Sequence, residues 1–573
     1  MRRLNIARLS LLVLSAAVIS SCGGIKKMKD LEASVKYEVT PKVLEVNNNE
    51  VELTVTGKYP VKYFNKKATM TIQPVLKYKT GQINLKPYLL QGEAITGNEK
   101  VISNASGGEF SYSDKFTYKE EMRSATVEVF VQAAVKDQKL DIGTYKLADG
   151  IVATSKLVFI DPKSLMMADK FVRTKPQSKE ASILFLINKD DVRASELKKQ
   201  EIKDLTEYIK SLSTNPKLKL TGINMSSYAS PDGPMDKNED LADGRGTSAD
   251  KFFRKEMKKN KITQADSNNL FTYLKTAEDW DGFKSLMETS DIADKDLIIR
   301  VLSMYSDAEV REREIKNISK AYEEVAEKIL PQLRRAKLVV NVDAEGLTDE
   351  EMLIYADSNP DTFQIEELLY IAAKISDLDK KAALYKKATE KFATDIRGFN
   401  NLGYVYIQQG KLDDAKTVLE AAKALESNDV VKNNIGVVLM LQGDMPAAEE
   451  ILTSSLGAGE YVSYNLGIIN IIKGKYDIAK SYFGTACEYN AALAKVLNKN
   501  YEDALSTLQC DKTEAAKVFY LRSVVGARID NTDMLFNNLR TAVGKDSNLK
   551  AFAKEDAEFI KYFTNDTFKS IVE

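Results

Sequence analysis

The strongest constraint on this chain is a short motif that recurs three times in its C-terminal third. Asn401-Leu402-Gly403 returns as Asn434-Ile435-Gly436 and as Asn465-Leu466-Gly467, at spacings of 33 and 31 residues. A second glycine and an alanine follow each copy at fixed offsets, namely Gly410, Gly443 and Gly474, and Ala415, Ala448 and Ala479. Self-similarity at such a period indicates stacked units, each of which buries its apolar face only against its neighbours.

The spacing predicts pairs of antiparallel helices over residues 350–573. Gly403, Gly436 and Gly467 allow the first helix of each pair to approach the second closely, and the next glycine ends the first helix. Ala415, Ala448 and Ala479 are expected where the second helix crosses its partner. The pattern resembles the tetratricopeptide (TPR) family, which implies an all-α solenoid, and three phenylalanines are expected to cap its open end: Phe559, Phe563 and Phe568.

A solenoid of this kind presents an extended concave surface. The resemblance implies that this surface binds a peptide or a protein partner, and the alternative is that the repeats serve only as architecture. The sequence does not show which residues contact the partner.

The N-terminus predicts export and lipid attachment. Three arginines precede an apolar run of about a dozen residues, which is too short to span a bilayer, and small residues then lead to Cys22. This order resembles the lipobox of bacterial lipoproteins, which implies that residues 1–21 are a signal peptide and that Cys22 carries the lipid. An ordinary signal peptide ending near a cysteine is the alternative.

Residues 22–35 are polar and rich in lysine, and we expect them to form a tether. Lys26, Lys27 and Lys29 precede the first acid, Asp30. Surface lipoproteins of Bacteroidetes generally carry an acidic cluster directly after the cysteine. The opposite pattern here favours an outer-membrane protein on the periplasmic face.

Composition excludes several classes of function. The 573 residues include no histidine, which removes Ser-His-Asp and Cys-His catalysis and His-ligated zinc. Basic and acidic residues nearly balance, at 82 and 83, so nothing indicates a nucleic-acid partner. We expect a protein that is not an enzyme and carries no cofactor or metal.

Residues 36–162 predict an antiparallel β-sandwich of immunoglobulin-like character. Apolar and polar residues alternate over 43–46 and 50–56 around an asparagine turn at 47–49, as in a β-hairpin. The segments 69–77, 126–135 and 151–160 alternate in the same way. A spacer or docking role is expected for this domain.

Residues 163–179 are expected to form a linker, and residues 180–345 an α/β domain. Strands are predicted at 181–187, 218–228 and 336–342, and helices at 195–212 and 238–258, with helices dominating up to Pro331. This order predicts an α/β sandwich with right-handed crossovers.

A run from Tyr228 to Arg245 carries a second resemblance. Gly233, Asn238, Leu241 and Arg245 match the pattern G-x-T-D-x-x-G followed by N-x-x-L-S-x-x-R-A, which is typical of OmpA-like domains. The resemblance implies binding of the peptidoglycan stem peptide, in which an aspartate and the arginine hold the charged groups of diaminopimelate. The combination resembles outer-membrane lipoproteins of Bacteroidetes.

The sequence departs from that pattern at the acid, because Ser230 stands in the place of the family's aspartate. Asp232 is the candidate for the missing carboxylate, and the candidate peptidoglycan-binding residues are therefore Arg245, Asp232, Asn238 and Ser230. The alternative is that Arg245 is only a surface residue of a helix. Asp236, Asn238 and Asp240 imitate a calcium loop, but Leu241 occupies the position that requires glycine.

Cys487 and Cys510 are the remaining cysteines. In an oxidising compartment they could pair, and the alternative is that both are small buried residues in helices.

The sequence thus predicts a multidomain protein with a β-sandwich, an OmpA-like α/β domain and a TPR solenoid. The expected function is that of a scaffold, anchored in the outer membrane by lipid, associated with peptidoglycan and bound to a protein partner of the envelope machinery. A surface-exposed adhesion or nutrient-uptake accessory is one alternative, and a glycan or wall hydrolase is another.

Overall fold

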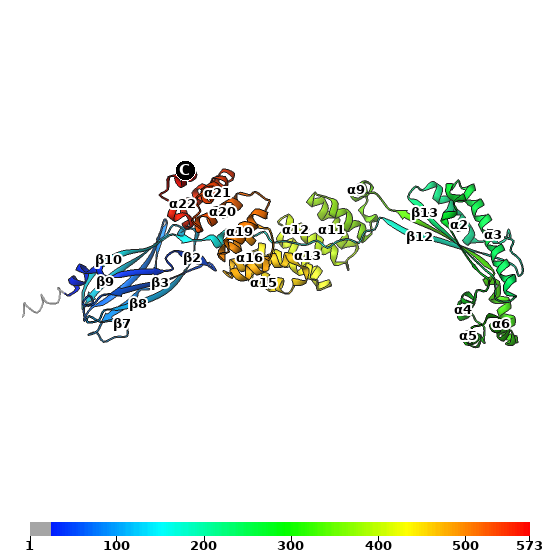
Figure 1. Ribbon diagram of the computed structural model, residues 1–573, viewed down its shortest axis with the longest axis horizontal. Helices are drawn as coiled ribbons and strands as arrows, with labels where there is room; N and C mark the ends of the chain where they lie inside the picture. The colour runs from blue at the N-terminus through cyan, green and yellow to red at the C-terminus, as the bar shows by residue number, and fades with distance from the viewer. Residues whose placement is uncertain (1–23) are drawn as a thin grey trace, which may run out of the picture. The chain divides into compact units, whose positions relative to one another are not determined.

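The computed structural model describes residues 24–573, which form two compact units (Figure 1). One unit comprises the residues up to Ala168 together with Ile375–Glu573, and the other comprises Asp169–Lys374. The predicted signal peptide and Cys22 lie outside the described residues.

The N-terminal domain of the first unit consists of two β-sheets. The first sheet has the order β1-β3-β2-β11, with β8 also paired to β3, and the second has the order β10-β9-β4-β6-β7, with β5 paired to β4. The strands are β1 Lys36–Thr40, β2 Leu44–Asn47, β3 Glu50–Tyr59, β4 Thr69–Tyr78, β5 Gly81–Asn84, β6 Tyr88–Gly92, β7 Lys100–Ile102, β8 Gly108–Thr117, β9 Thr126–Val135, β10 Gln138–Asp149 and β11 Ile151–Val152.

Alternation of apolar and polar residues places one face of each sheet in a shared core. Val51, Leu53 and Val55 of β3 and Val129 and Val131 of β9 are all buried in it. The predicted hairpin is present, with Val46 opposite Val51 across the turn. Most strand pairs are antiparallel, but β2–β11 and β6–β7 are parallel.

Two segments of this domain differ from prediction. The expected tether is folded from Gly24 onward, because a helical turn over residues 24–30 buries Ile25 and Met28 in the sandwich core. The expected strand at 151–160 is reduced to β11, after which the chain forms the 3-10 helix η3 Thr154–Leu157 and then leaves the sheet. Leu157 and Val158 pack against helices instead of pairing as a strand, and Phe159 and Ile160 are exposed.

The second unit contains a four-stranded mixed sheet of order β12-β15-β13-β14, covered by helices. Its strands are β12 Thr174–Leu184, β13 Leu218–Tyr228, β14 Phe271–Thr276 and β15 Arg335–Glu345. Its helices are α2 Gln200–Thr214, α3 Met235–Lys259, α4 Trp280–Thr289, α5 Lys295–Met304, α6 Ala308–Asn317, α7 Ser319–Lys328, α8 Leu330–Leu333, α9 Asp349–Ser358 and α10 Ile365–Lys374.

Two features of this unit differ from prediction. Strand β14 lies within a stretch expected to be helical, and its residues are mostly exposed because it forms an edge of the sheet, so no alternation marks it. Strand β12 begins at Thr174, inside the expected linker. Residues 163–168 of that linker belong to the first unit.

The remaining helices form the C-terminal array of the first unit, shown from yellow-green to red in Figure 1. They are α11 Leu378–Lys391, α12 Ile396–Gln408, α13 Leu412–Leu425, α14 Asp429–Leu441, α15 Met445–Thr453, α16 Glu460–Ile472, α17 Tyr476–Phe483, α18 Tyr489–Leu497, α19 Tyr501–Cys510, α20 Ala516–Arg528, α21 Thr532–Lys545, α22 Asn548–Glu555 and α23 Asp566–Val572.

Glycines set the packing of each repeat, as the sequence predicts. A Cβ atom at Gly403 would lie 2.5 Å from Cγ of Leu419, and one at Gly436 would lie 2.6 Å from Cγ of Leu452. The same position of the third copy, Gly467, lies against the ring of Phe483. The helix-ending glycines Gly410, Gly443 and Gly474 have φ values of 71°, 86° and 70°, and the alanines Ala415, Ala448 and Ala479 are fully buried.

The C-terminal end of the array is covered as expected. The ring of Phe568 lies 5.7 Å from that of Phe559 and 5.8 Å from that of Phe563, measured between centroids. Phe559 and Phe568 are buried, so these rings cover apolar surface that an open solenoid end would expose.

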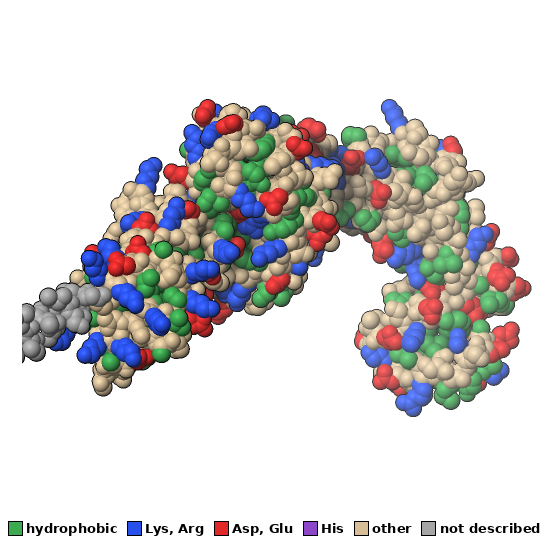
Figure 2. All heavy atoms as spheres, turned by 60° about the vertical axis from the view of Figure 1, so that its left-hand side comes forward, with side chains coloured by type: hydrophobic (Ala, Val, Ile, Leu, Met, Phe, Trp, Pro, Cys, Tyr) green, Lys and Arg blue, Asp and Glu red, His purple; other side chains and the backbone are tan. Residues whose placement is uncertain are grey.

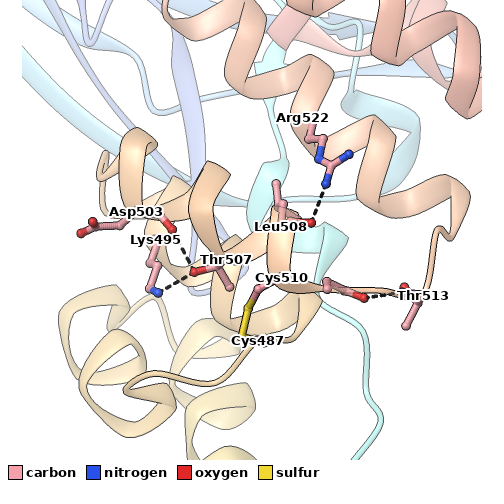
Figure 3. Close-up of a disulfide and its surroundings, with 9 residues drawn as sticks. Cys487, Lys495, Asp503, Thr507, Leu508, Cys510, Thr513 and Arg522 are labelled. Carbon is pink, nitrogen blue, oxygen red and sulfur yellow. Dashed lines mark hydrogen bonds between the residues drawn. A yellow bond between two sulfur atoms is a disulfide. The ribbon is translucent and has the colours of Figure 1, made fainter.

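Cys487 and Cys510 form a disulfide that joins the segment after α17 to the end of α19 (Figure 3). Around the disulfide, the Lys495 amine donates to the Thr507 hydroxyl at 2.6 Å, and that hydroxyl donates to the Asp503 carbonyl at 2.8 Å. The disulfide and these bonds hold α18 and α19 together.

The β-sandwich packs directly against the end of the helical array. Arg528 of α20 forms a bidentate ion pair with Glu558, and both side chains also contact the Thr154 hydroxyl of η3. The guanidinium of Arg123 lies 3.6 Å from the ring centroid of Phe552. The sandwich and the helical array therefore form one unit.

Candidate functional site

A chain segment lies extended against the helical array and is held there by asparagines. We call residues 159–167 the strap; they follow η3 after Val158 and have no regular secondary structure. The first helices of four successive helix pairs each contribute one buried asparagine that binds the strap. We call these four residues the asparagine ladder: Asn401 of α12, Asn434 of α14, Asn465 of α16 and Asn490 of α18.

Each ladder amide binds both polar groups of one strap residue. The Met167 N–H donates to Oδ1 of Asn401 at 2.7 Å, and Nδ2 of Asn401 donates to the Met167 carbonyl at 2.9 Å. Asn434 binds the N–H and carbonyl of Leu165 in the same way, both at 2.7 Å. These bonds satisfy backbone groups that the array would otherwise bury without partners.

The two remaining steps repeat this geometry. Asn465 binds Lys163, with distances of 2.7 Å to the N–H and 3.0 Å to the carbonyl. Asn490 binds Phe159, with distances of 3.0 Å and 2.7 Å. The strap therefore runs antiparallel to the order of the repeats, and its last three contacts fall on every second residue. Such spacing is that of an extended chain, whose residues face the same side at a period of two.

Further side chains connect the steps of the asparagine ladder. Nδ2 of Asn434 also donates to Oδ1 of Asn400 at 2.9 Å, and Nδ2 of Asn465 donates to Oδ1 of Asn433 at 3.0 Å. Asn400 and Asn433 in turn donate to the strap carbonyls of Leu165 and Lys163. All of these amides are buried, and their mutual bonds fix which end of each is the donor.

The wider spacing between Phe159 and Lys163 is filled by Asp161. Its Oδ1 accepts from the Tyr464 hydroxyl at 2.9 Å and from Nδ2 of Asn490 at 2.9 Å. Burial raises the pKa of Tyr464, and the neighbouring carboxylates of Asp161 and Glu488 raise it further. Tyr464 is therefore a hydrogen-bond donor at neutral pH, and this end of the strap is fixed by side chains as well as backbone.

The repeated triplet contains three of the four asparagines of this site, but the sequence pattern did not predict what they bind. The repeated triplet predicted close packing through its glycine, whereas its asparagine carried no assigned role. An asparagine that recurs on the buried side of an apolar helix needs hydrogen-bond partners, because a buried amide is rarely left unpaired. The partners lie in a segment that was expected to be part strand and part linker.

The peptidoglycan-binding candidates lie together in the second unit, at the start of α3. Arg245 is 1% exposed, and its guanidinium donates to the carbonyls of Lys189, Tyr228 and Leu186 at 3.1, 2.9 and 3.4 Å. Burial lowers the pKa of Arg245 to about 10, and the nearby charge of Arg334 adds to this effect. Arg245 is therefore a buried residue and not a surface residue of a helix. It connects α3 to the loop after β12 and to the end of β13.

Ser230 and Asp232 both contact Arg334, a residue outside the matched sequence pattern. Arg334 donates through Nε to the Ser230 hydroxyl at 3.1 Å and through Nη2 to the Asp232 carboxylate at 2.9 Å. The Ser230 hydroxyl also donates to Asp232. Asp232 therefore points inward, and its charge is paired with Arg334.

The fourth candidate, Asn238, is buried and closes the loop before α3. Its Nδ2 donates to the Gly233 carbonyl at 3.0 Å. The matched residues Gly233 and Asn238 thus shape the loop. Two carboxylates, Asp232 and Asp190, lie near the guanidinium of Arg245 and act to raise its pKa, against the effects of burial and of Arg334.

Charges of both signs lie on the surface outside this cluster. On the face shown in Figure 2, basic and acidic side chains are interspersed. Among residues 24–573, no helix is long and apolar enough to cross a membrane, and no group of three or more acidic or cysteine side chains is placed to hold a metal ion.

Comparison with known proteins supports the assignment of the repeats. The family model for the tetratricopeptide repeat matches residues 396–429, which span α12 and α13, so the chain carries a tetratricopeptide repeat there. Such repeats in general bind protein partners and occur in scaffolds without enzymatic activity. No curated protein matches the chain.

Solved structures that resemble the chain include two that are described as tetratricopeptide repeat proteins. PilF of Pseudomonas aeruginosa is 18% identical, with 36% of this chain and 97% of that chain covered and a TM-score of 0.30. A tetratricopeptide repeat protein from Parabacteroides merdae is 13% identical, with 37% and 90% covered and a TM-score of 0.28. YrrB, a TPR protein with an unusual peptide-binding site, is 19% identical, with 36% and 100% covered and a TM-score of 0.23.

Proposed function

We propose that this protein is a non-enzymatic scaffold of the bacterial envelope, anchored by lipid at Cys22 in the outer membrane and facing the periplasm. The asparagine ladder carries the proposal, because it is a surface built to hold an extended polypeptide through its backbone. Sites of that kind recognise protein segments rather than small substrates.

Two observations support an extracytoplasmic location. The order of residues before Cys22 resembles a lipobox, and Cys487 and Cys510 are joined in a disulfide. Disulfides persist in the bacterial periplasm and are rare in the reducing cytosol. Metabolic labelling with a fatty-acid analogue tests the anchor: the wild-type protein should be labelled and Cys22→Ala should not.

The protein partner is best identified by crosslinking in intact cells, followed by affinity capture from solubilised membranes. The expected result is a defined envelope protein crosslinked to the helical array, recovered at similar yield in independent preparations. Recovery of only abundant, unrelated proteins would contradict the scaffold function. Protease treatment of intact cells separates this proposal from the alternative of a surface-exposed accessory, which would be degraded.

The second unit is proposed to attach the scaffold to peptidoglycan through the cluster of Arg245, Arg334 and Asp232. Co-sedimentation with purified peptidoglycan tests this, with Asp232→Asn as the informative variant because it keeps the shape of the side chain and removes its charge. Loss of binding in Arg245→Lys but not in Asp232→Asn would exclude a role for Asp232 in place of the family's aspartate. Retained binding in both variants would exclude the cluster.

A further inference from the structure

We propose that the strap is a replaceable occupant of the asparagine ladder, and that the partner of this scaffold binds by inserting an extended segment of its own in place of the strap. This inference rests on the proposed function, since it assumes that a partner binds through the repeats. The inference goes further in two respects. It says that the partner is recognised through an extended segment, and that release of the strap makes the asparagine ladder accessible.

The asparagine ladder recognises backbone and not sequence. Each of its four amides binds an N–H and a carbonyl, groups that every residue other than proline carries. An incoming segment therefore needs only to be extended and to lack proline at the bonded positions. The occupant can change without any change in the site.

Side chains of the strap contribute little burial that an incoming segment would have to match. Phe159, Ile160 and Met166 are 51%, 42% and 38% exposed. Leu157 and Val158, which are half-buried against the core of the helical array, lie before the strap, and Met167 at its far end is half-buried against the array in the same way. The sandwich would thus stay docked while the strap leaves.

Only one edge of the strap is bonded. Lys163, Leu165 and Met167 turn their N–H and carbonyl groups toward the asparagine ladder, and in an extended chain the groups of Ser164 and Met166 point the opposite way. Within residues 24–573, no hydrogen bond to the backbone groups of Ser164 or Met166 is found. The strap is therefore held like an added strand and not like a strand inside a sheet.

The two ends of the strap are held by different contacts. Side-chain bonds among Asp161, Tyr464 and Asn490 add to the backbone bonds at the Phe159 end, whereas Met167 is held by the two hydrogen bonds to Asn401 and by packing against the array. Cavities of similar volume adjoin both ends, about 520 Å³ at Met167 and about 530 Å³ at Asp161. An incoming segment therefore has room at either end, and release begins at Met167, where side chains add no further hydrogen bonds between the strap and the asparagine ladder among the described residues.

The first test uses a fluorescent peptide with the sequence of residues 157–169 and the full chain without its signal peptide. Leu165→Pro removes the N–H that Asn434 accepts, and Ser164→Pro is the matched control because its N–H faces away from the asparagine ladder. A tethered strap competes at a millimolar effective concentration, so the wild-type protein should bind the peptide weakly. Leu165→Pro should bind it about tenfold more tightly, and adding Asn434→Ala should abolish the gain.

Equal binding by wild type, Leu165→Pro and Ser164→Pro would overturn the proposal. If Leu165→Pro does not fold, hydrogen exchange of the wild-type protein decides. The amides of Lys163, Leu165 and Met167 should exchange at least tenfold faster than the central amides of α14, because the strap opens locally. Exchange of these amides only through global unfolding would identify the strap as a permanent part of the core and contradict its replacement.

The outcome is separable from that of the proposed function. A crosslinked partner whose binding leaves the exchange of the strap amides unchanged would refute replacement while leaving the scaffold in place. A groove that accepts the peptide in vitro, in a protein that captures no partner in cells, would refute the scaffold and leave replacement standing.

Discussion

At the scale of single residues, the asparagine ladder combines two properties that rarely occur together. Asparagine is a weak helix former and is seldom fully buried, yet all four ladder residues are buried within helices. The free-energy cost of burying these amides is offset because each one finds both a donor and an acceptor on the strap. These side chains therefore stabilise the protein through the strap that they bind and not through the helices that carry them.

Asn434→Ala tests the strength of one step. The Leu165 N–H would lose its partner and the Leu165 carbonyl would keep only the bond from Asn400, so the free energy of unfolding should fall by about 1–3 kcal/mol. Urea denaturation followed by circular dichroism measures the change. Asn98→Ala, at an exposed position of the sandwich, should change it by less than about 0.5 kcal/mol, and equal effects at both sites would contradict the assigned role.

Gly403→Ala tests the close approach of the paired helices. Its new Cβ would lie 2.5 Å from Cγ of Leu419, so overpacking should lower the free energy of unfolding by about 1–3 kcal/mol. Gly544→Ala is the matched control, because nothing lies within 4 Å of a Cβ atom at Gly544 in α21, and it should stabilise by about 0.5 kcal/mol. A Gly403→Ala protein as stable as wild type would exclude tight packing at this position.

At the scale of elements, the fourth helix pair departs from the regular repeat and is reinforced. Asn490-Ala491-Ala492 occupies the place of the Asn-Leu-Gly triplet, Lys499 adopts the left-handed conformation of the helix-ending glycines, and Ala504 takes the alanine position. The connection before α18 contains Cys487, whose disulfide reaches the end of α19. The spacing from Asn465 to Asn490 is shorter than the spacings between the earlier copies. The disulfide holds this shorter helix pair together, so that Asn490 keeps its position in the asparagine ladder.

Reduction of the disulfide should therefore destabilise the array. The cysteines are 23 residues apart in sequence, and a loop of that size is stabilised by about 3 kcal/mol when closed. The thermal midpoint of the wild-type protein should fall on addition of dithiothreitol. The thermal midpoint of a Cys487→Ser/Cys510→Ser protein should be lower than that of the oxidised wild-type protein and should not change with the reductant. A wild-type midpoint that does not change with the reductant would contradict the presence of a stabilising disulfide.

At the scale of the whole molecule, the first unit combines segments that lie far apart in the sequence. The sandwich packs on helices that follow the second unit in the sequence, and the strap extends this contact along the array. Arg528 and Glu558, whose side chains are 14% and 5% exposed, lie at this interface. Burial opposes the charge of Arg528, but its bonds to Glu558 prevail and raise its pKa.

Arg528→Ala should uncouple the sandwich from the array. It leaves the Glu558 carboxylate buried without its cation, a change that costs about 3–5 kcal/mol. Chemical denaturation followed at several wavelengths should then show the sandwich unfolding before the helices. Arg528→Ala combined with Glu558→Gln removes the isolated charge and should recover part of the loss, whereas a single coincident transition in both proteins would show that the pair does not hold the interface.

Much of the architecture could be read from local patterns. Alternation marked β3, β4 and β9, and the repeated glycines and alanines marked the helix pairs, because each signal lies within a few residues of the element that it specifies. Strand β14 was not predicted, because a strand at the exposed edge of a sheet shows no alternation of apolar and polar residues. The role of Arg334 was not predicted, because its partners Ser230 and Asp232 lie about a hundred residues earlier in the chain.

The sequence by itself determined the repeat packing, the hairpin and the candidate residues near Arg245. Only the tertiary structure decided what the repeated asparagines are for. An amide specifies that it needs a donor and an acceptor but not where they come from, and here the backbone of Lys163, Leu165 and Met167 supplies them from more than two hundred residues away. Every residue other than proline carries the same backbone N–H and carbonyl, so no pattern of side chains in the strap could predict this contact.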